Sequence, residues 1–237
     1  MTGGIWGSAS FWLGVGGAAL AAVGAYGTGF GWWAFPVGGL MLVAGVVMAL
    51  VAVIAALIAL VRLKRTGGVG TRGWIGAIAA IGLLGTIGYW LNLGRGAPMI
   101  HDVATDSADP PAFNVIASRK DNLAGVGTIE NWRKLHDAAY GDIRPLILAK
   151  PPGEVIQSAK RLVEARGWAI ASVTSDRIEA TETASPFAFK DDVVIVATPV
   201  ADGTRVDVRS TSQIGVGDLG VNARRVRALL QDLKDAS

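Results

Sequence analysis

The sequence predicts an N-terminal three-helix transmembrane bundle followed by an α+β domain made of a helix, a four-stranded antiparallel meander sheet and a second helix. The first 61 residues contain no Asp, Glu, Lys, Arg or His, and all 19 acidic residues follow position 100. Only 17% of the chain is charged, whereas soluble domains carry about 25%. Apolar and polar residues alternate over residues 177–184 and 204–212, as in strands with one buried face.

Residues 1–95 form the predicted transmembrane domain. Three stretches reach the roughly 20 apolar residues that a spanning helix needs, and they cover residues 8–28, 33–61 and 74–93. Pro36 near the start of the second stretch indicates that this helix begins outside the hydrocarbon. Six of the eight tryptophans lie in this half, mostly near the predicted helix ends, where amphipathic rings prefer the headgroup level.

Small residues recur in these helices at helical spacing, which lets helix backbones approach closely in lipid. A compact bundle is favoured over three separate anchors for this reason. The rows are Gly14, Ala18 and Ala22; Gly17, Ala21 and Ala25; Gly45 and Ala49; Gly76 and Ala80.

The connection between the second and third helices sets the predicted orientation. Arg62, Lys64, Arg65 and Arg72 give it four positive charges and no negative one, and such loops stay in the cytoplasm. We therefore expect a multi-pass protein of the bacterial cytoplasmic (inner) membrane, with its C-terminal domain on the periplasmic or outer face. This holds whether or not the first helix is retained.

Residues 96–150 are predicted to form a linker and an irregular segment that contains several prolines. One helix is expected within it, over residues 129–140, with His136 at the surface. Residues 151–237 form the predicted α+β domain. A helix is expected over 152–166. The elements after it are strands at 168–174, 177–184, 192–199 and 204–212 and a helix over 219–233. Helices would cover one face of the sheet, and the other face would be polar or covered by residues 100–150.

Composition excludes several classes of function. The chain has no cysteine, so it has no disulfide and no thiol chemistry. Residues 96–237 carry 17 basic and 19 acidic residues, which argues against binding of nucleic acid. No charged residue lies inside a predicted span, which argues against transport. No cofactor is predicted, and the expected partners are the lipid bilayer and a membrane or envelope protein.

Three polar groups are candidate ligand-binding sites: first His101, Asp102, Thr105, Asp106 and Asp109; second Arg205, Asp207 and Arg209; third Asp218, Asn222 and Arg225. The first group could hold a metal or provide acid/base chemistry, or its side chains could cap turns. The second group could bind an anion or a lipid headgroup, or form a solvated charge ladder. The third group could bind an anion at a helix N-terminus, or Asp218 could cap that helix.

Several motifs occur together over residues 97–237: His101-Asp102-Val103-Ala104-Thr105-Asp106, Asp109-Pro110-Pro111-Ala112-Phe113, Phe189-Lys190-Asp191-Asp192, Arg205-Val206-Asp207-Val208-Arg209, and Asp218-Leu219-Gly220 with Asn222-Ala223-Arg224-Arg225. With these motifs the segment resembles the domain-of-unknown-function family fourteen ninety-nine of bacteria and plastids, whose members often carry N-terminal membrane helices. The family commonly has a basic residue where this chain has Gln213-Ile214, and the resemblance implies no activity.

The favoured hypothesis is therefore a non-enzymatic, membrane-anchored domain that binds a partner protein, a lipid or a small ligand at the membrane surface. One alternative is a metal-dependent or acid/base hydrolase centred on His101 with Asp102 or Asp106. A further alternative is an accessory subunit that joins a larger membrane complex through its small-residue rows.

Overall fold

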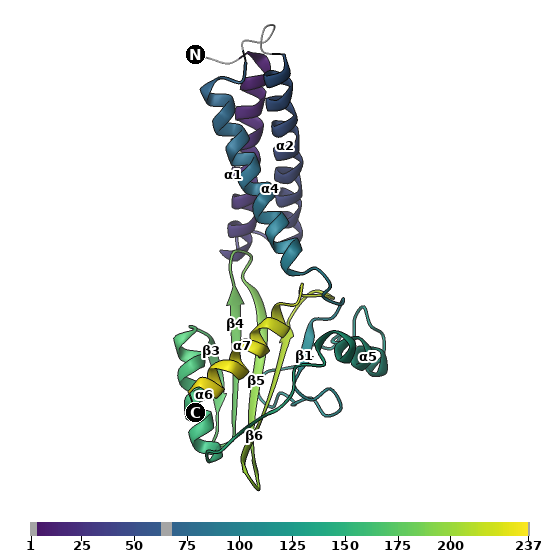
Figure 1. The fold of residues 1–237 in the computed structure, drawn as a ribbon, viewed down its shortest axis with the longest axis vertical. Coiled ribbons are helices and arrows are strands. Elements are labelled where there is room, and N and C mark those ends of the chain that lie inside the picture. The colour runs from purple at the N-terminus through teal and green to yellow at the C-terminus, as the bar shows by residue number, and fades with distance from the viewer. Residues whose placement is uncertain (1–3, 63–67, 237) are drawn as a thin grey trace. The chain divides into compact units, whose positions relative to one another are not determined.

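The computed structural model describes residues 4–62 and 68–236 and divides into two compact units (Figure 1). Unit 1 runs to Asn92 and includes Ser185–Ala188, and unit 2 comprises Leu93–Ala184 and the chain from Phe189 onward. Three long apolar helices followed by an α+β fold with an antiparallel sheet confirm the predicted fold class.

The three apolar helices are α1 (Ile5–Gly29), α2 (Phe35–Val61) and α4 (Gly70–Leu93), each long and apolar enough to cross a membrane. Helix α2 begins two residues later than predicted because Pro36 occupies its first turn, where its fixed φ suits a helix start. Helix α4 begins four residues earlier, which places Arg72 inside the helix. Lys64 and Arg65 lie outside the described residues.

Small residues let these helices touch through their backbones. A Cβ atom on Gly14 would collide with the backbone of Gly76, and one on Gly17 would meet the carbonyl of Gly45. The row of Gly17, Ala21 and Ala25 is buried, whereas Ala22 of the other row is exposed. Bundle packing therefore uses one of the two predicted rows of α1 in full and the other only in part.

Unit 2 is built on an antiparallel sheet with the order β1-β6-β5-β4-β3, in which β2 also pairs with β6. The predicted four-stranded meander is present as β3 (Ala169–Val173), β4 (Arg177–Ala184), β5 (Phe189–Val200) and β6 (Gly203–Ser212). Among the described residues the sheet nevertheless has six strands, because β1 (Asp102–Ala104) pairs with residues 209–211 of β6 and β2 (Leu146–Leu148) pairs with residues 204–206, one after the other along the same edge. Strands of three residues are too short to show alternation.

Helices α6 (Pro152–Ala165) and α7 (Val221–Asp235) pack on one face of the sheet (Figure 1). Every second strand residue points to them, so apolar side chains from both layers form one core. Its sheet side includes Ile178, Val193, Ile195, Val206 and Val208, and its helix side includes Val155, Ile156, Val163, Val226, Leu229 and Leu233.

The opposite face is covered by residues 105–122, here called the covering segment, which donates to Glu179 of β4 and accepts from Arg209 of β6. Helix α5 (Ile129–Tyr140) lies instead against β1 and α7: Nε1 of Trp132 donates to the carbonyl of Asp102 (3.0 Å), and Trp132 and Tyr140 belong to the same core as α6 and α7. The fully buried carboxylate of Glu179 accepts the backbone N–H groups of Asn114, Val115 and Ile116 at 2.7, 3.0 and 2.9 Å. Desolvation raises the pKa of Glu179, but these three N–H groups outweigh it and the pKa is lowered overall. An irregular segment is thus held on the sheet by a charged group.

His136 of α5 is buried, so the predicted surface position is wrong. Its ring lies 5.1 Å from the ring of Trp132, and its Nε2 accepts the backbone N–H of Ala104 at 3.3 Å. The sequence showed α5 as an amphipathic helix but not that α5 would lie against β1, which supplies this donor.

Candidate functional site

A pocket of about 380 Å³ opens between the covering segment and strands β5 and β6 of unit 2. Residues from the covering segment form one wall, and outward-facing residues at the end of the sheet form the other. The lining residues are Phe113, Ile116, Ala117, Ser118, Arg119, Asn122, Asp192, Arg209, Thr211, Ser212 and Gln213.

Arg209 is fixed at this pocket by the neighbouring strand. Strand alternation points its side chain away from the helices, and β1 places Asp102 beside it. The two side chains form a bidentate ion pair, with N···O distances of 2.9 and 2.6 Å. Burial lowers the pKa of Arg209, but the bonded carboxylate outweighs it, so the pKa is raised overall. The guanidinium also donates to the carbonyl of Pro111 (3.1 Å) and lies 5.7 Å from the ring centre of Phe113.

His101 lies behind the pocket lining and is 2% exposed. Asn122 donates from its Nδ2 to Asp102 (2.5 Å), so its Oδ1 faces the Nε2 of His101 (3.2 Å) and the hydroxyl of Thr211 (3.1 Å). The same Nε2 also lies 3.2 Å from Nη1 of Arg119. The amide oxygen only accepts and the guanidinium only donates, so these two contacts favour opposite tautomers of the ring. Nδ1 of His101 is buried and has no hydrogen-bond partner among the described residues.

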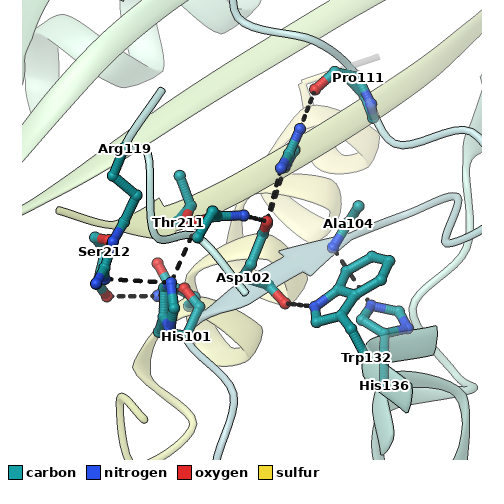
Figure 2. A network of polar contacts seen from close by, with 12 residues as sticks. His101, Asp102, Ala104, Pro111, Arg119, Trp132, His136, Thr211 and Ser212 are labelled. Atoms are coloured by element: carbon teal, nitrogen blue, oxygen red, sulfur yellow. Dashed lines mark hydrogen bonds and ion pairs between the residues drawn. The ribbon is translucent and has the colours of Figure 1, made fainter. Parts of the chain in front are cut away.

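Arg119 closes the other side of the pocket and faces the segment that follows β6. Its Nη1 donates to the carbonyls of Gly215 (2.8 Å) and Ser212 (3.3 Å), and its Nε and Nη2 donate to Asp121 at 2.9 and 2.8 Å. This pairing lowers the pKa of Asp121 to about 2. Figure 2 shows Arg119 and Ser212 on one side of His101 and Asp102, and Trp132 and His136 on the other.

Asp192 is the carboxylate of the pocket lining. It accepts from the hydroxyl of Thr181 (2.7 Å) and from Nε2 of Gln213 (3.0 and 3.2 Å). The lining therefore presents two guanidinium groups against one carboxylate that is already bonded to two neutral donors.

A second polar group lies farther along β6. Arg205 binds Asp106 (2.7 Å) and Asp207 (2.8 Å), and the hydroxyl of Thr105 donates to Asp207 (3.0 Å). The hydrogen bond from Arg205 lowers the pKa of Asp106. Asp106 also accepts the backbone N–H of Asp109 (3.1 Å), as in a capped turn. The predicted charge ladder is thus bonded to the covering segment.

The third group lies on the helix face of the sheet. The carboxylate of Asp218 accepts the N–H groups of Gly220 (2.8 Å) and Asn222 (2.6 Å), so it caps α7 from two residues ahead of the N-cap residue Gly220. Burial raises the pKa of Asp218. Arg225 pairs with Asp191 (2.6 Å) and with Glu182, and Asn222 donates to the carbonyl of His101 (2.9 Å).

The predicted site residues therefore fall into three groups. His101, Asp102 and Arg209 share the network behind the pocket, whereas Asp106 and Asp109 belong with Arg205. Within residues 4–62 and 68–236, no three His, Asp or Glu side chains gather so that they could hold a metal ion. The sequence did not reveal the pocket residues Arg119, Asn122, Asp192 and Gln213. Arg119, Asn122 and Gln213 lie in irregular segments without periodicity, and Asp192 lies within β5, whose alternation does not mark it as a pocket residue.

One comparison with known proteins covers most of the α+β unit. A family model described as "Protein of unknown function (DUF1499)" matches residues 102–233, which is more than half of the chain and spans all three polar groups except His101. No curated protein matches the chain. The extent of the match shows that this chain belongs to the DUF1499 family of proteins of unknown function.

Proposed function

We propose that this chain is a membrane-anchored binding protein whose unit 2 holds a small anionic ligand, through a carboxylate or phosphate group, outside the cytoplasm. One observation carries the proposal: Arg119 and Arg209 line the same pocket, opposite a single carboxylate, Asp192. The planar guanidinium group matches carboxylate and phosphate in shape and charge.

The two arginines differ in what they can offer. Asp102 and Pro111 hold Arg209 in one orientation, and three of its five N–H groups serve these partners. The ion-pair partner of Arg119, Asp121, has a side chain that is 67% exposed. Exposed ion pairs contribute little to stability, so an incoming anion can replace Asp121 at small energetic expense.

The membrane placement in this proposal rests on charge. Arg62, Lys64, Arg65 and Arg72 lie in or beside the connection between α2 and α4, and a basic connection favours the cytoplasmic side. The chain after Leu93 would then lie on the periplasmic or outer face of a bacterial inner membrane.

The alternatives receive less support from the geometry. For a hydrolase, Asp102 and Asp106 would have to act with His101, but each is held in an ion pair with its own arginine, Arg209 or Arg205. For an accessory subunit, Gly14, Gly17 and Gly76 would have to meet another protein, but they pack against helices of the same chain.

A pocket-filling variant tests the proposal. Ala117 lines the pocket and is exposed, so Ala117→Trp would occupy the pocket without disturbing the core. The full chain in mild detergent would be titrated with inorganic phosphate and with glucose, while the arginine Nε–H signals are followed by NMR. Saturable shifts with phosphate alone are expected, with affinity reduced about tenfold or more in Ala117→Trp, as for loss of about 1.4 kcal/mol or more.

The matched control is Ala138→Trp, at an exposed position of α5 outside the pocket lining, which should bind phosphate as the wild type does. If the wild type shows no saturable response, or if both variants respond equally, the pocket is not an anion site. A stronger response to glucose than to phosphate would contradict the anionic ligand.

A further inference from the structure

Four large apolar side chains lie on the outside of unit 2, near the start of α7. They are 40–61% exposed, and together they are called the apolar rim: Met99, Ile214, Val216 and Leu219. Single exposed apolar residues are ordinary, but a cluster of them marks a surface that contacts something else.

The rim residues come from two segments that touch. A Cβ atom placed on Gly217 would lie 3.2 Å from the sulfur of Met99, and one on Gly94 would lie 2.7 Å from Cβ of Leu219. Met99 therefore packs against the middle of the loop between β6 and α7, and Leu219 packs against the segment that leads into unit 2.

The rim adjoins the last residue of α4. Nη1 of Arg224 donates to the carbonyls of Leu93 (3.1 Å) and Leu219 (3.0 Å), so one guanidinium joins the end of this helix to the rim. Met99 follows Leu93 by six residues, which span at most about 20 Å even when extended. Because α4 is long and apolar enough to cross a membrane, covalent connection keeps the rim close to the surface from which α4 would emerge.

Leu219 also adopts a backbone conformation that leucine rarely takes. Its φ is +54° although it is not glycine, which is unfavourable for a residue with a branched side chain. The fold thus holds an exposed apolar side chain in a strained position, as expected for a residue that contacts another surface.

Basic residues flank the rim. Arg95 follows Gly94 and is exposed, and Lys190 is exposed and accepts the N–H of Gln213 at its carbonyl, directly before Ile214. Apolar side chains beside cations fit the interface of a bilayer that contains anionic lipids.

We infer that the apolar rim inserts into the interfacial layer of the bilayer that α4 enters, so that its partner is lipid. None of the four rim residues lines the pocket, although Arg119 of the pocket donates to the carbonyl of Gly215 between Ile214 and Val216. It predicts that unit 2 rests on the membrane at the loop between β6 and α7.

Site-specific labelling tests this inference, because the chain has no cysteine of its own. Val216→Cys would carry an environment-sensitive fluorophore, with Ala138→Cys on the exposed surface of α5 as the matched control. The full chain would be reconstituted into vesicles of phosphatidylcholine with phosphatidylglycerol, with and without bromine on the upper acyl chain. The label at Val216 should emit at shorter wavelength and lose about half of its intensity with brominated lipid, as for an interfacial side chain.

The label at Ala138 should be unaffected by bromine and quenched by aqueous iodide. Equal responses at the two positions would overturn the inference. So would a label at Val216 that is shielded in native membranes but exposed to iodide in pure lipid vesicles, because its partner would then be a protein. Neither readout uses phosphate, so this test and the pocket test can fail separately.

Discussion

At the scale of single residues, Glu179 has the most consequential position, because one buried carboxylate holds the wall of the pocket. We predict that Glu179→Gln loosens the covering segment. The amide retains one oxygen for Asn114 but turns N–H groups toward the backbone N–H groups of Val115 and Ile116. Buried donors without acceptors cost about 1–3 kcal/mol. Amide hydrogen exchange of residues 113–117 should therefore accelerate, while exchange in β5 changes less.

Glu164→Gln is the matched control, since Glu164 is exposed and pairs with Lys160 in the preceding helical turn. It should leave exchange in the covering segment unchanged. Equal exchange in both variants would show that the segment is held by other contacts.

The same carboxylate predicts a response to acid. The pKa of Glu179 is lowered in the folded chain below its ordinary value of 4.5. A lowered carboxyl pKa stabilises the fold above the ordinary value, and this contribution is lost as the pH falls through the folded pKa. Exchange in the covering segment of the wild type should therefore rise below pH 4.5, and Glu179→Gln should remove that part of the pH dependence.

Glu179 and the residues of the candidate site also show which contacts could not be predicted from the sequence. Alternation along β4 correctly placed Glu179 on the face away from the helices, which we predicted to be either polar or covered by residues 100–150; the second alternative is the one observed. The sequence contains no sign that backbone N–H groups some 65 positions away would meet this carboxylate. The candidates His101, Asp102 and Arg209 meet in one network, whereas their partner Asn122 lies in an irregular segment with no pattern.

At the scale of elements, α7 is tied to the sheet by a buried cation. Arg225 contacts Glu182 and Asp191 and lies 5.9 Å from the ring centre of Trp168. Removing one member of a buried ion pair leaves an unpaired charge and costs about 3–5 kcal/mol. We therefore predict that Arg225→Met strongly destabilises unit 2, measured as the free energy of opening from hydrogen exchange in β5 and β6.

Arg227→Met provides the control on the same helix. Arg227 pairs with Asp142 at 2.6 Å, but this pair is largely exposed, and such pairs contribute about 0–1 kcal/mol. If the two variants were equally destabilised, the Arg225 cluster would not hold α7 on the sheet.

Elements with a long periodic pattern were the ones that the sequence predicted well. Helices α5, α6 and α7 and strands β3 to β6 appear near their expected bounds, because burial of one face imposes a period on their residues. Strands β1 and β2 were missed, since three residues carry no period and their formation depends on the edge of β6, which is distant in the sequence. The exposed edge of a sheet is commonly covered by a short strand, a helix or a loop.

At the scale of the whole molecule, the uneven distribution of charge along the chain predicts how the protein is placed in the membrane. Leading residues without charge, a short basic connection and an acidic remainder predict helices in lipid and a folded unit outside the cytoplasm. The apolar helices and the α+β unit are present as predicted. Orientation is a property of the chain in its membrane, so it requires a measurement on intact cells.

The absence of cysteine makes that measurement direct. We predict that Ala138→Cys, on the exposed surface of α5, reacts with a membrane-impermeant maleimide in intact spheroplasts. Thr66→Cys, beside Lys64 and Arg65, should react only after the membrane is permeabilised, because basic connections remain in the cytoplasm. The reversed labelling pattern would place unit 2 in the cytoplasm and remove the basis for an extracytoplasmic ligand. Lipid contact by the apolar rim would still be testable on that side, since it depends on the end of α4 and not on which compartment that end faces.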